Sequence, residues 1–326
     1  MITRQLTDVE MVTDGLAFPE GPVALDDGSV LVVEIVGGRL TRVDSDGSKD
    51  VIAELGGGPN GAAIGPDGAV YVCNNGGMGA GPRSMPGIQR VDIATGDWSW
   101  LYTDSDGAPF VAPNDLVFDA AGGFWFTDLR GGTLHYATAS GSSVATVARA
   151  TDPNGIGLSP GGDILYWAQT STRQVLRRRI ASPGRLAPSV GHGARALTRH
   201  GSLDPFTLLV GLPGAMELDS LAVDSSGAVC VGTLVQGGVT EVPAEVPAEG
   251  SSDDGLDGIV HWVLPDRLAD RLVTNICFGG DDLTTAHLTC SETGRLVRCS
   301  WHRPGLALAF GAANANPDGT NHEPRR

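Results

Sequence analysis

A repeated pattern of short segments runs through most of the chain. Each copy has a polar residue, a few alternating apolar residues, a turn rich in Asp and Gly, and a second apolar strand. The second copy shows this form clearly, with Pro59-Asn60-Gly61 at its start, a turn at residues 66–68 and a strand at residues 70–73. The polar positions of the six copies are Glu20, Asn60, Asn114, Asn154, Asp219 and Asn275.

The spacing of the copies predicts the fold. The six polar positions are separated by 40, 54, 40, 65 and 56 residues. A repeat of roughly 40–50 residues with several short strands is typical of a β-propeller, in which each repeat makes one blade. A third strand follows each hairpin, at residues 39–43, 87–91, 133–136, 174–178, 258–263 and 295–299. We therefore expect an all-β fold: a six-bladed β-propeller with four-stranded antiparallel blades around a central channel.

The two ends of the chain have different expected roles. We expect residues 9–12 to complete the last blade, because a closed ring leaves no exposed strand edge. Residues 1–310 then form a single propeller domain. Residues 311–326 are small, polar and free of aromatic side chains, and they predict a disordered C-terminal tail.

Charge and hydropathy exclude several classes of partner. The chain has 22 basic and 38 acidic residues and a net charge of −16, which disfavours nucleic acid and anionic membranes. No apolar run approaches the roughly 18 residues of a membrane span. The N-terminus lacks the apolar stretch of a signal peptide, and five scattered cysteines do not suggest a disulfide framework. We expect a cytoplasmic protein with a small-molecule partner.

The six polar positions predict a cation site. The start of the innermost strand of each blade faces the channel, so these side chains should converge at one mouth. Burying the carboxylates of Glu20 and Asp219 together is costly unless a cation joins them. A ring of carboxylate and amide oxygens without Cys or His suits calcium first, then magnesium or manganese, with zinc also possible.

A plainer interpretation exists for part of the ring. Asn in a Pro-Asn-Gly sequence often only makes a turn, which would account for Asn60 and Asn154. It does not account for the carboxylates at the same register. Asn275 has the weakest surrounding motif, and a structural role is favoured for it.

The ordered set of motifs carries a family resemblance. The segments are Phe18-Pro19-Glu20-Gly21-Pro22, Pro59-Asn60-Gly61-Ala62-Ala63, Pro113-Asn114-Asp115, Asn154-Gly155-Ile156 and the stretch around Asp219. Over roughly residues 14–300 the chain resembles the gluconolactonase / senescence-marker-protein (regucalcin) / luciferin-regenerating-enzyme family, whose members are six-bladed propellers with one divalent cation at the channel mouth. The resemblance implies that Glu20, Asn154 and Asp219 are metal ligands. It makes Asn114 either a fourth ligand or a substrate contact, and we expect Asn60 to contact substrate.

The resemblance also implies an activity. Most characterised members hydrolyse lactones, commonly those of sugar acids. We therefore expect a divalent-metal-dependent hydrolase that opens a lactone ring, with the cation polarising the carbonyl and activating water. Asp219 is the candidate catalytic residue, a ligand that also handles a proton.

Two positions depart from the family pattern. Many sugar-lactone members have Arg two residues before the Asn of the Asn-Asp motif, where this chain has Ala112. A cationic hydrogen-bond donor for a polyhydroxylated substrate is therefore missing. Asp219 is followed by Ser220, where many members have Gly.

Three alternatives to a lactonase stay open. The same ring could serve a phosphotriesterase-like hydrolase, which needs only another electrophile. A strictosidine-synthase-like propeller would work without a metal, and the oxygen ring argues against it. A non-catalytic metal-binding propeller is the third.

Three long segments are candidate substrate walls. Residues 75–86 and 234–257 are expected to join second and third strands, on the face of the ring. The insert at residues 183–214 is expected to join blades four and five on the same face.

Overall fold

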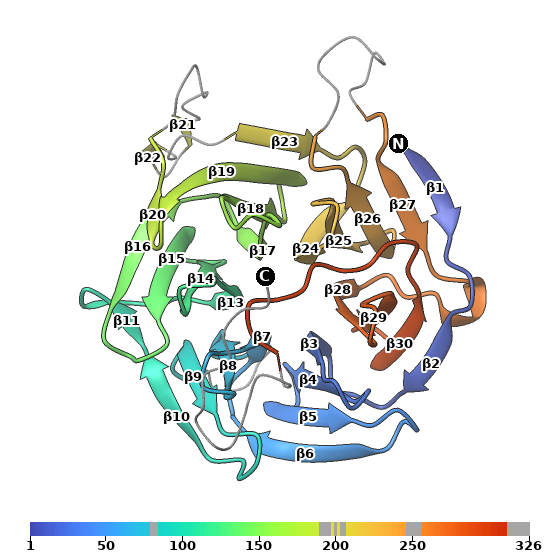
Figure 1. The fold of residues 1–326 in the computed structure, drawn as a ribbon, viewed down its shortest axis with the longest axis horizontal. Coiled ribbons are helices and arrows are strands. Elements are labelled where there is room, and N and C mark those ends of the chain that lie inside the picture. The colour runs from blue at the N-terminus through green and yellow to red at the C-terminus, as the bar shows by residue number, and fades with distance from the viewer. Residues whose placement is uncertain (79–83, 189–196, 199–200, 203–206, 246–255, 312–326) are drawn as a thin grey trace.

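The chain forms six antiparallel blades around a central channel (Figure 1). The computed structural model describes residues 1–78, 84–188, 197–198, 201–202, 207–245 and 256–311. Within these residues the helical content is one 3-10 turn, η1 (Asp266–Leu268). No helix in the described part of the chain is long and apolar enough to cross a membrane. The predicted all-β, six-bladed propeller is confirmed.

The blades are named here in chain order, with strands given from the channel outward. Blade 1 has β3 (Pro19–Ala24), β4 (Val30–Glu34), β5 (Arg39–Val43) and β6 (Lys49–Glu54). Blade 2 has β7 (Pro59–Ile64), β8 (Val70–Asn74), β9 (Gly87–Val91) and β10 (Trp98–Tyr102). Blade 3 has β13 (Pro113–Phe118), β14 (Gly123–Asp128), β15 (Thr133–Thr138) and β16 (Val144–Arg149).

The second half of the ring follows the same plan. Blade 4 has β17 (Pro153–Leu158), β18 (Ile164–Gln169), β19 (Gln174–Ser182) and β23 (Thr207–Gly211). Blade 5 has β24 (Glu217–Val223), β25 (Val229–Leu234), β26 (Gly238–Val242) and β27 (Val260–Val263). Blade 6 has β28 (Val273–Gly279), β29 (Thr285–Cys290), β30 (Arg295–Ser300) and β2 (Glu10–Thr13). The short extra strands are β1 (Ile2–Gln5), β11 (Asp104–Ser105), β12 (Ala108–Pro109), β20 (Arg185–Leu186), β21 (Leu197–Thr198) and β22 (Gly201–Ser202).

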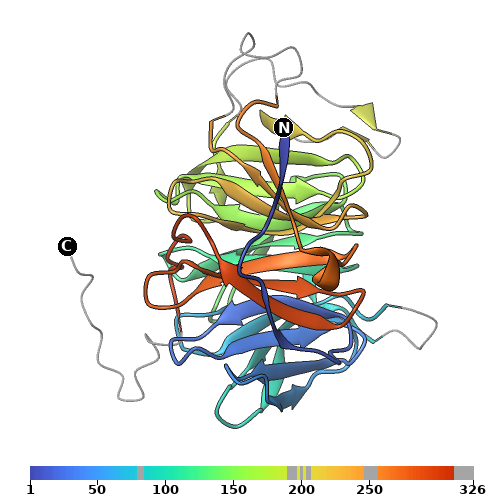
Figure 2. The same cartoon turned by 90° about the vertical axis from the view of Figure 1, so that its right-hand side faces the viewer.

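The N-terminal segment closes the ring. Strand β2 pairs antiparallel with β30 and supplies the outer strand of blade 6, as predicted from the sequence. Strand β1 adds a fifth strand to blade 5 by pairing parallel with β27. Figure 2 shows the N-terminal strands running along the rim across these two blades. The first and last segments of the propeller are thereby held together, so fewer strand edges are free to pair with another chain.

The core lies between neighbouring blades. Strands buried on both faces carry runs of apolar residues, as in β4, where four valine and leucine residues precede Glu34 and all five residues are buried. Between blades 2 and 3, Tyr71 packs edge-on against Phe118, with ring centroids 5.0 Å apart. Such contacts pack the strands of one blade against the innermost strand of the next, so the channel wall is a rigid support for the side chains at its mouth.

Two predicted loops lie elsewhere. Residues 238–242 form the third strand of blade 5, so the predicted third strand at 258–263 is the fourth. Residues 183–206 fall inside blade 4, between its third and fourth strands. In an antiparallel meander, turns after the first and third strands share one end and those after the second and fourth share the other. The segments after β26 and β19 therefore leave from the end opposite the start of the innermost strands. Of the predicted walls, residues 75–86 and the short turn at 235–237 are the parts that join a second strand to a third.

Candidate metal centre

A β-bulge at the start of the innermost strands positions the predicted ring. In blades 2 to 5 the ladder to the second strand skips, so that two residues of the inner strand face one residue of its neighbour. The paired bulge residues are Asn60-Gly61, Asn114-Asp115, Asn154-Gly155 and Asp219-Ser220. A bulge turns a side chain away from its regular direction. In blades 2 to 5 the repeat seen in the sequence is thus a repeated bulge at one level of the channel, whereas Glu20 and Asn275 are paired with Val33 and Thr289.

Four oxygens of this ring are buried and have no hydrogen-bond partner. They are Glu20 Oε1, Asn60 Oδ1, Asn114 Oδ1 and Asn154 Oδ1. The four side chains come from four consecutive blades, and each residue is at most 6% exposed. A buried polar atom without a partner costs on the order of 1–3 kcal/mol. Four such acceptors at one level, without a donor for any of them, fit a cation ligand set.

Asn275 holds Glu20 rather than joining the unpaired oxygens. Its Nδ2 donates to Glu20 Oε2 at 2.9 Å, and its own Oδ1 accepts from the Ile276 amide at 2.8 Å. The Gly21 amide donates to the same Glu20 oxygen at 2.7 Å. The structural role favoured for Asn275 agrees with these contacts.

Asn154 is also oriented by a neighbour. Its Nδ2 donates to Thr170 Oγ1 at 3.0 Å, which leaves Oδ1 for the channel. The hydroxyl of Thr127 donates to the Asn154 carbonyl at 2.8 Å. Blade 3 and blade 4 are thereby coupled at the level of the ring.

Carboxylates dominate the electrostatics of the site. Burial raises the pKa of Glu20, and the hydrogen bonds from Asn275 and Gly21 oppose that rise. Burial, followed by the charge of Glu20, raises the pKa of Asp219 well above its usual range. Asp219 is less enclosed than Glu20, because the residue is half-buried by surface area whereas Glu20 is 1% exposed. A divalent cation among these groups would favour their charged forms.

Asp115 is a third carboxylate that the candidate set left out. Burial, with repulsion from Glu20, raises its pKa to about 7. It occupies the second bulge position, where blades 2 and 4 carry Gly61 and Gly155. A Cβ on Gly61 would stand 2.6 Å from Asp115 Oδ1, so that glycine makes room for the carboxylate. In the sequence, the signal for Asp115 is an acidic residue at a position where blades 2 and 4 have glycine.

The donor set is rich in amides. Among the described residues no group of three or more His, Cys, Asp or Glu side chains is arranged to hold a metal. The ring has two carboxylates, and its remaining unpaired oxygens are amide oxygens, which also bind calcium. The fit to a metal therefore depends on Asn60, Asn114 and Asn154 as much as on the acids.

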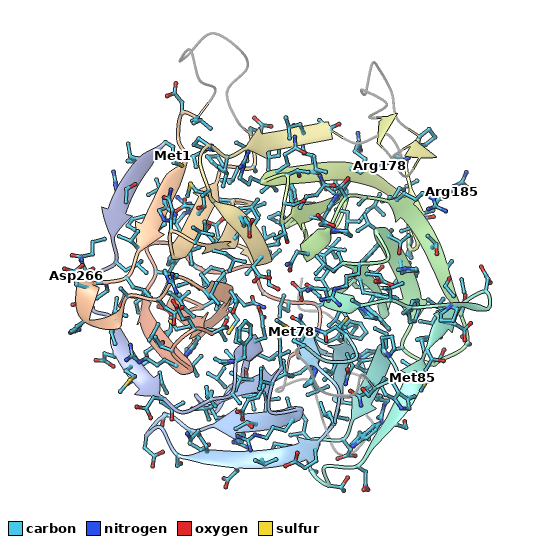
Figure 3. All side chains as sticks on the ribbon, turned by 180° about the vertical axis from the view of Figure 1, so that it is seen from behind. Met1, Met78, Met85, Arg178, Arg185 and Asp266 are labelled. Carbon is cyan, nitrogen blue, oxygen red and sulfur yellow. The ribbon has the colours of Figure 1, made fainter. Side chains whose placement is uncertain are left out.

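Apolar residues lie in two segments next to the mouth of the channel, one after β8 and one before β13. Met78, which follows β8, lies near the middle of the propeller when it is viewed from behind (Figure 3). Met78 and Met85 are each 49% exposed, and they flank residues 79–83, which lie outside the described residues. Ala112 is buried directly before β13, and its amide donates to Asp128. The predicted wall at residues 75–86 is thus described only at its two ends.

The fold and ring define a class: a six-bladed propeller with a cluster of oxygen-bearing side chains at one mouth. A model of the "SMP-30/Gluconolactonase/LRE-like region" matches residues 18–292. The chain therefore belongs to the SMP-30/gluconolactonase/LRE-like family, as the motifs indicated.

Three similar proteins illustrate the family. Lactonase drp35 of Staphylococcus haemolyticus is 27% identical over 189 residues, covering 55% of this chain and 54% of that protein. A gluconolactonase of Zymomonas mobilis is 25% identical over 247 residues, covering 65% of each. The matches thus span less than two thirds of either relative. Regucalcin of Agrobacterium tumefaciens, described as a calcium-binding protein, shares the fold with a TM-score of 0.67 at 16% identity, covering 94% of this chain and all of that one.

Proposed function

We propose that this protein is a divalent-metal-dependent lactonase, with calcium as the preferred cation. The observation that carries the proposal is the set of four buried, unpaired oxygens beside Asp219 at one mouth of the channel. Family membership and the two relatives named as a lactonase and a gluconolactonase support lactone hydrolysis.

The residues divide into holding and reacting groups. Glu20, Asn154 and Asp219 would hold the cation, with Asn114 as a fourth ligand or a substrate contact and Asn60 as a substrate contact. A bound divalent cation polarises a carbonyl oxygen and makes a nearby water more acidic. The proposal needs no Cys or His ligand, which suits a hard cation.

Asp219 is proposed to move the proton. Its carboxylate takes a proton from the attacking water as the new C–O bond forms at the lactone carbonyl. It then returns that proton to the ring oxygen as the original C–O bond breaks. The greater exposure of Asp219 favours it for this role over Glu20, which is 1% exposed.

The test is a panel of lactones, carboxylic esters and phosphotriesters, assayed with and without chelator. We expect lactone hydrolysis that is lost on chelation and restored by calcium. Hydrolysis unaffected by chelator would contradict the metal role. Preferred cleavage of phosphotriesters would favour the other hydrolase, and metal binding without turnover on any substrate would favour a binding protein.

A further inference from the structure

The channel holds a second space, at the end opposite the ring. It is a cavity of about 550 Å³, walled by the later residues of the innermost strands and by residues 306–310. None of the side chains of Glu20, Asn60, Asn114, Asn154 or Asp219 lines it. Asp115, which follows the ring residue Asn114, and Asn275, which holds Glu20, lie at its inner end. These two residues lie between the cavity and the unpaired ring oxygens.

The C-terminal segment forms a built wall of this cavity. In Figure 1 the segment after β30 crosses the end of the channel. The Leu306 amide donates to the Val223 carbonyl at 3.0 Å, and the Gly305 amide donates to the Leu283 carbonyl at 2.8 Å. The ring of Phe310 packs edge-on against Phe118, with centroids 5.8 Å apart.

An ion-pair cluster anchors the start of this wall. The Arg303 guanidinium donates to Asp224 at 2.7 Å and also pairs with Glu241. Both carboxylates are buried and belong to blade 5. The wall is therefore fixed to the blades by charge as well as by backbone hydrogen bonds.

The lining restricts what the cavity can bind. Most of its side chains are aliphatic or aromatic, with contributions from every blade, such as Ile64, Leu158 and Phe278. Its charged lining residues are the acids Asp115 and Asp119, and no Lys, Arg or His of the described residues lines it. An anion would be buried without a cation partner, and a cation would be buried in a mostly apolar wall.

We propose that this cavity binds a neutral, mainly apolar small molecule with one hydroxyl or similar group. Apolar walls offer water few hydrogen-bond partners. Burial of an apolar ligand surface against these walls lowers the free energy of binding. The volume falls within the range of small-molecule sites, roughly 300–1,000 Å³. The polar inner end at Asp115 and Asn275 offers the hydroxyl a partner. This site is independent of the lactonase proposal.

The experiment uses two probes of equal chain length, 1-octanol and octanoate, titrated into the full chain by calorimetry at pH 8. We expect saturable binding of one octanol per chain and at least tenfold weaker binding of octanoate. Equal binding of the two probes would overturn the charge argument, and the lack of saturable octanol binding would overturn the site.

A matched pair of variants locates the binding. Ala121 is exposed, lines the cavity rim, and donates its amide to Asp119 at 2.9 Å. Ala94 is also exposed and donates in the same way to Asp92 at 2.9 Å, but it does not line the cavity. Ala121→Trp should weaken octanol binding at least tenfold, and Ala94→Trp should leave it unchanged.

Two further measurements keep the result decisive. Phe310→Ala removes a wall and should also weaken octanol binding, so octanol binding unaffected by both this variant and Ala121→Trp would contradict the location. Octanol and calcium should bind the same chain together, because Glu20, Asn60, Asn114, Asn154 and Asp219 do not line the cavity. Competitive displacement of calcium by octanol would place the probe at the ring and overturn the proposal.

Discussion

Asn275 donates a hydrogen bond to Glu20 across the junction of blades 6 and 1, with 2.9 Å between Nδ2 and Oε2. The two residues are 255 positions apart, so this bond joins the last innermost strand to the first. Because the Gly21 amide donates to the same oxygen, Oε2 is engaged twice while Oε1 has no partner. One contact therefore contributes to ring closure and also orients a proposed ligand.

The first prediction concerns that contact. Asn275→Ala removes a donor that fixes the Glu20 carboxylate, and loss of such an orienting bond typically lowers metal affinity by about 10–100-fold. Calorimetric titration with calcium measures the effect. We expect at least a tenfold rise in Kd.

Gln89→Ala is the matched control. Gln89 is a buried amide whose hydrogen bonds, to Asn74 and to the Leu55 carbonyl, lie within and between blades 1 and 2. Its loss should lower the melting temperature without changing calcium affinity. Equal losses of calcium affinity in both variants would reduce Asn275 to a general packing role.

The ring could be predicted from the sequence because the repeat has a strict physical cause. Blades 2 to 5 make the same bulge at the same level, so Asn60, Asn154 and Asp219 appear at equivalent positions along the chain. Asn275 occupies an equivalent position in the repeat, but its side chain donates a hydrogen bond to Glu20 and leaves no unpaired oxygen in the ring. Its role depends on the junction with blade 1, which no local pattern reports.

The second prediction separates a ligand from a proton carrier. Glu20→Gln and Asp219→Asn keep side-chain shape and remove one negative charge each. We expect Glu20→Gln to lose calcium affinity and to regain activity at high calcium. Asp219→Asn should stay inactive at saturating calcium, because an amide cannot accept the proton.

Turnover is measured against calcium concentration for both variants, with occupancy determined separately by calorimetry. Full recovery of Asp219→Asn at saturating calcium would show that this residue is only a ligand. Failure of Glu20→Gln to recover with the site occupied would assign it a part in the reaction.

The third prediction concerns substrate choice. Ala112 stands where we expect Arg in sugar-lactone members, and the exposed Met78 and Met85 add apolar surface. We expect higher kcat/KM for aromatic or sparsely hydroxylated lactones than for gluconolactone. The measurement is a kcat/KM series at equal calcium.

Ala112→Arg is the companion variant, and it should shift the ratio toward gluconolactone by restoring a cationic donor. A wild-type preference for gluconolactone by a wide margin would refute this account of the wall.

The fourth prediction concerns acid stability. Burial lowers the pKa of His135 and of His287 to about 4. In the unfolded chain the pKa of histidine is near 6.5, so the unfolded chain binds protons at pH values where the folded chain does not. Stability is therefore lost as the pH falls from about 6.5 to about 4. Each residue contributes up to about 3 kcal/mol of this loss.

Denaturant titrations at several pH values check the prediction. His287→Gln should flatten the dependence of unfolding free energy on pH across this window, and a double variant with His135→Gln should flatten it further. The residues lie in different blades, so their effects should add. A slope identical to that of the unmodified chain would contradict the assignment.

Loop placement was the part of the fold least visible in the sequence. The segment 238–242, Gly-Val-Thr-Glu-Val, is short and carries Glu241 and Thr240 on a buried strand. Local sequence does not predict a buried strand here, because the burial of Glu241 depends on its ion pair with Arg303, which lies far along the chain. One missed strand then moved the following loop to the wrong face. Asp115 was missed for a related reason, since its neighbours at that level come from other blades.

The central claim is that the ring binds a divalent cation, and calcium-dependent thermal stability tests it most directly. Calcium at about a hundred times its Kd should stabilise the chelated protein by about 2.7 kcal/mol, a rise in melting temperature of about 4 °C for a chain of this size. Glu20→Gln should show a smaller rise at the same calcium concentration, and elemental analysis of the unmodified protein should find one ion per chain. An unchanged melting curve, together with no bound metal, would contradict the account.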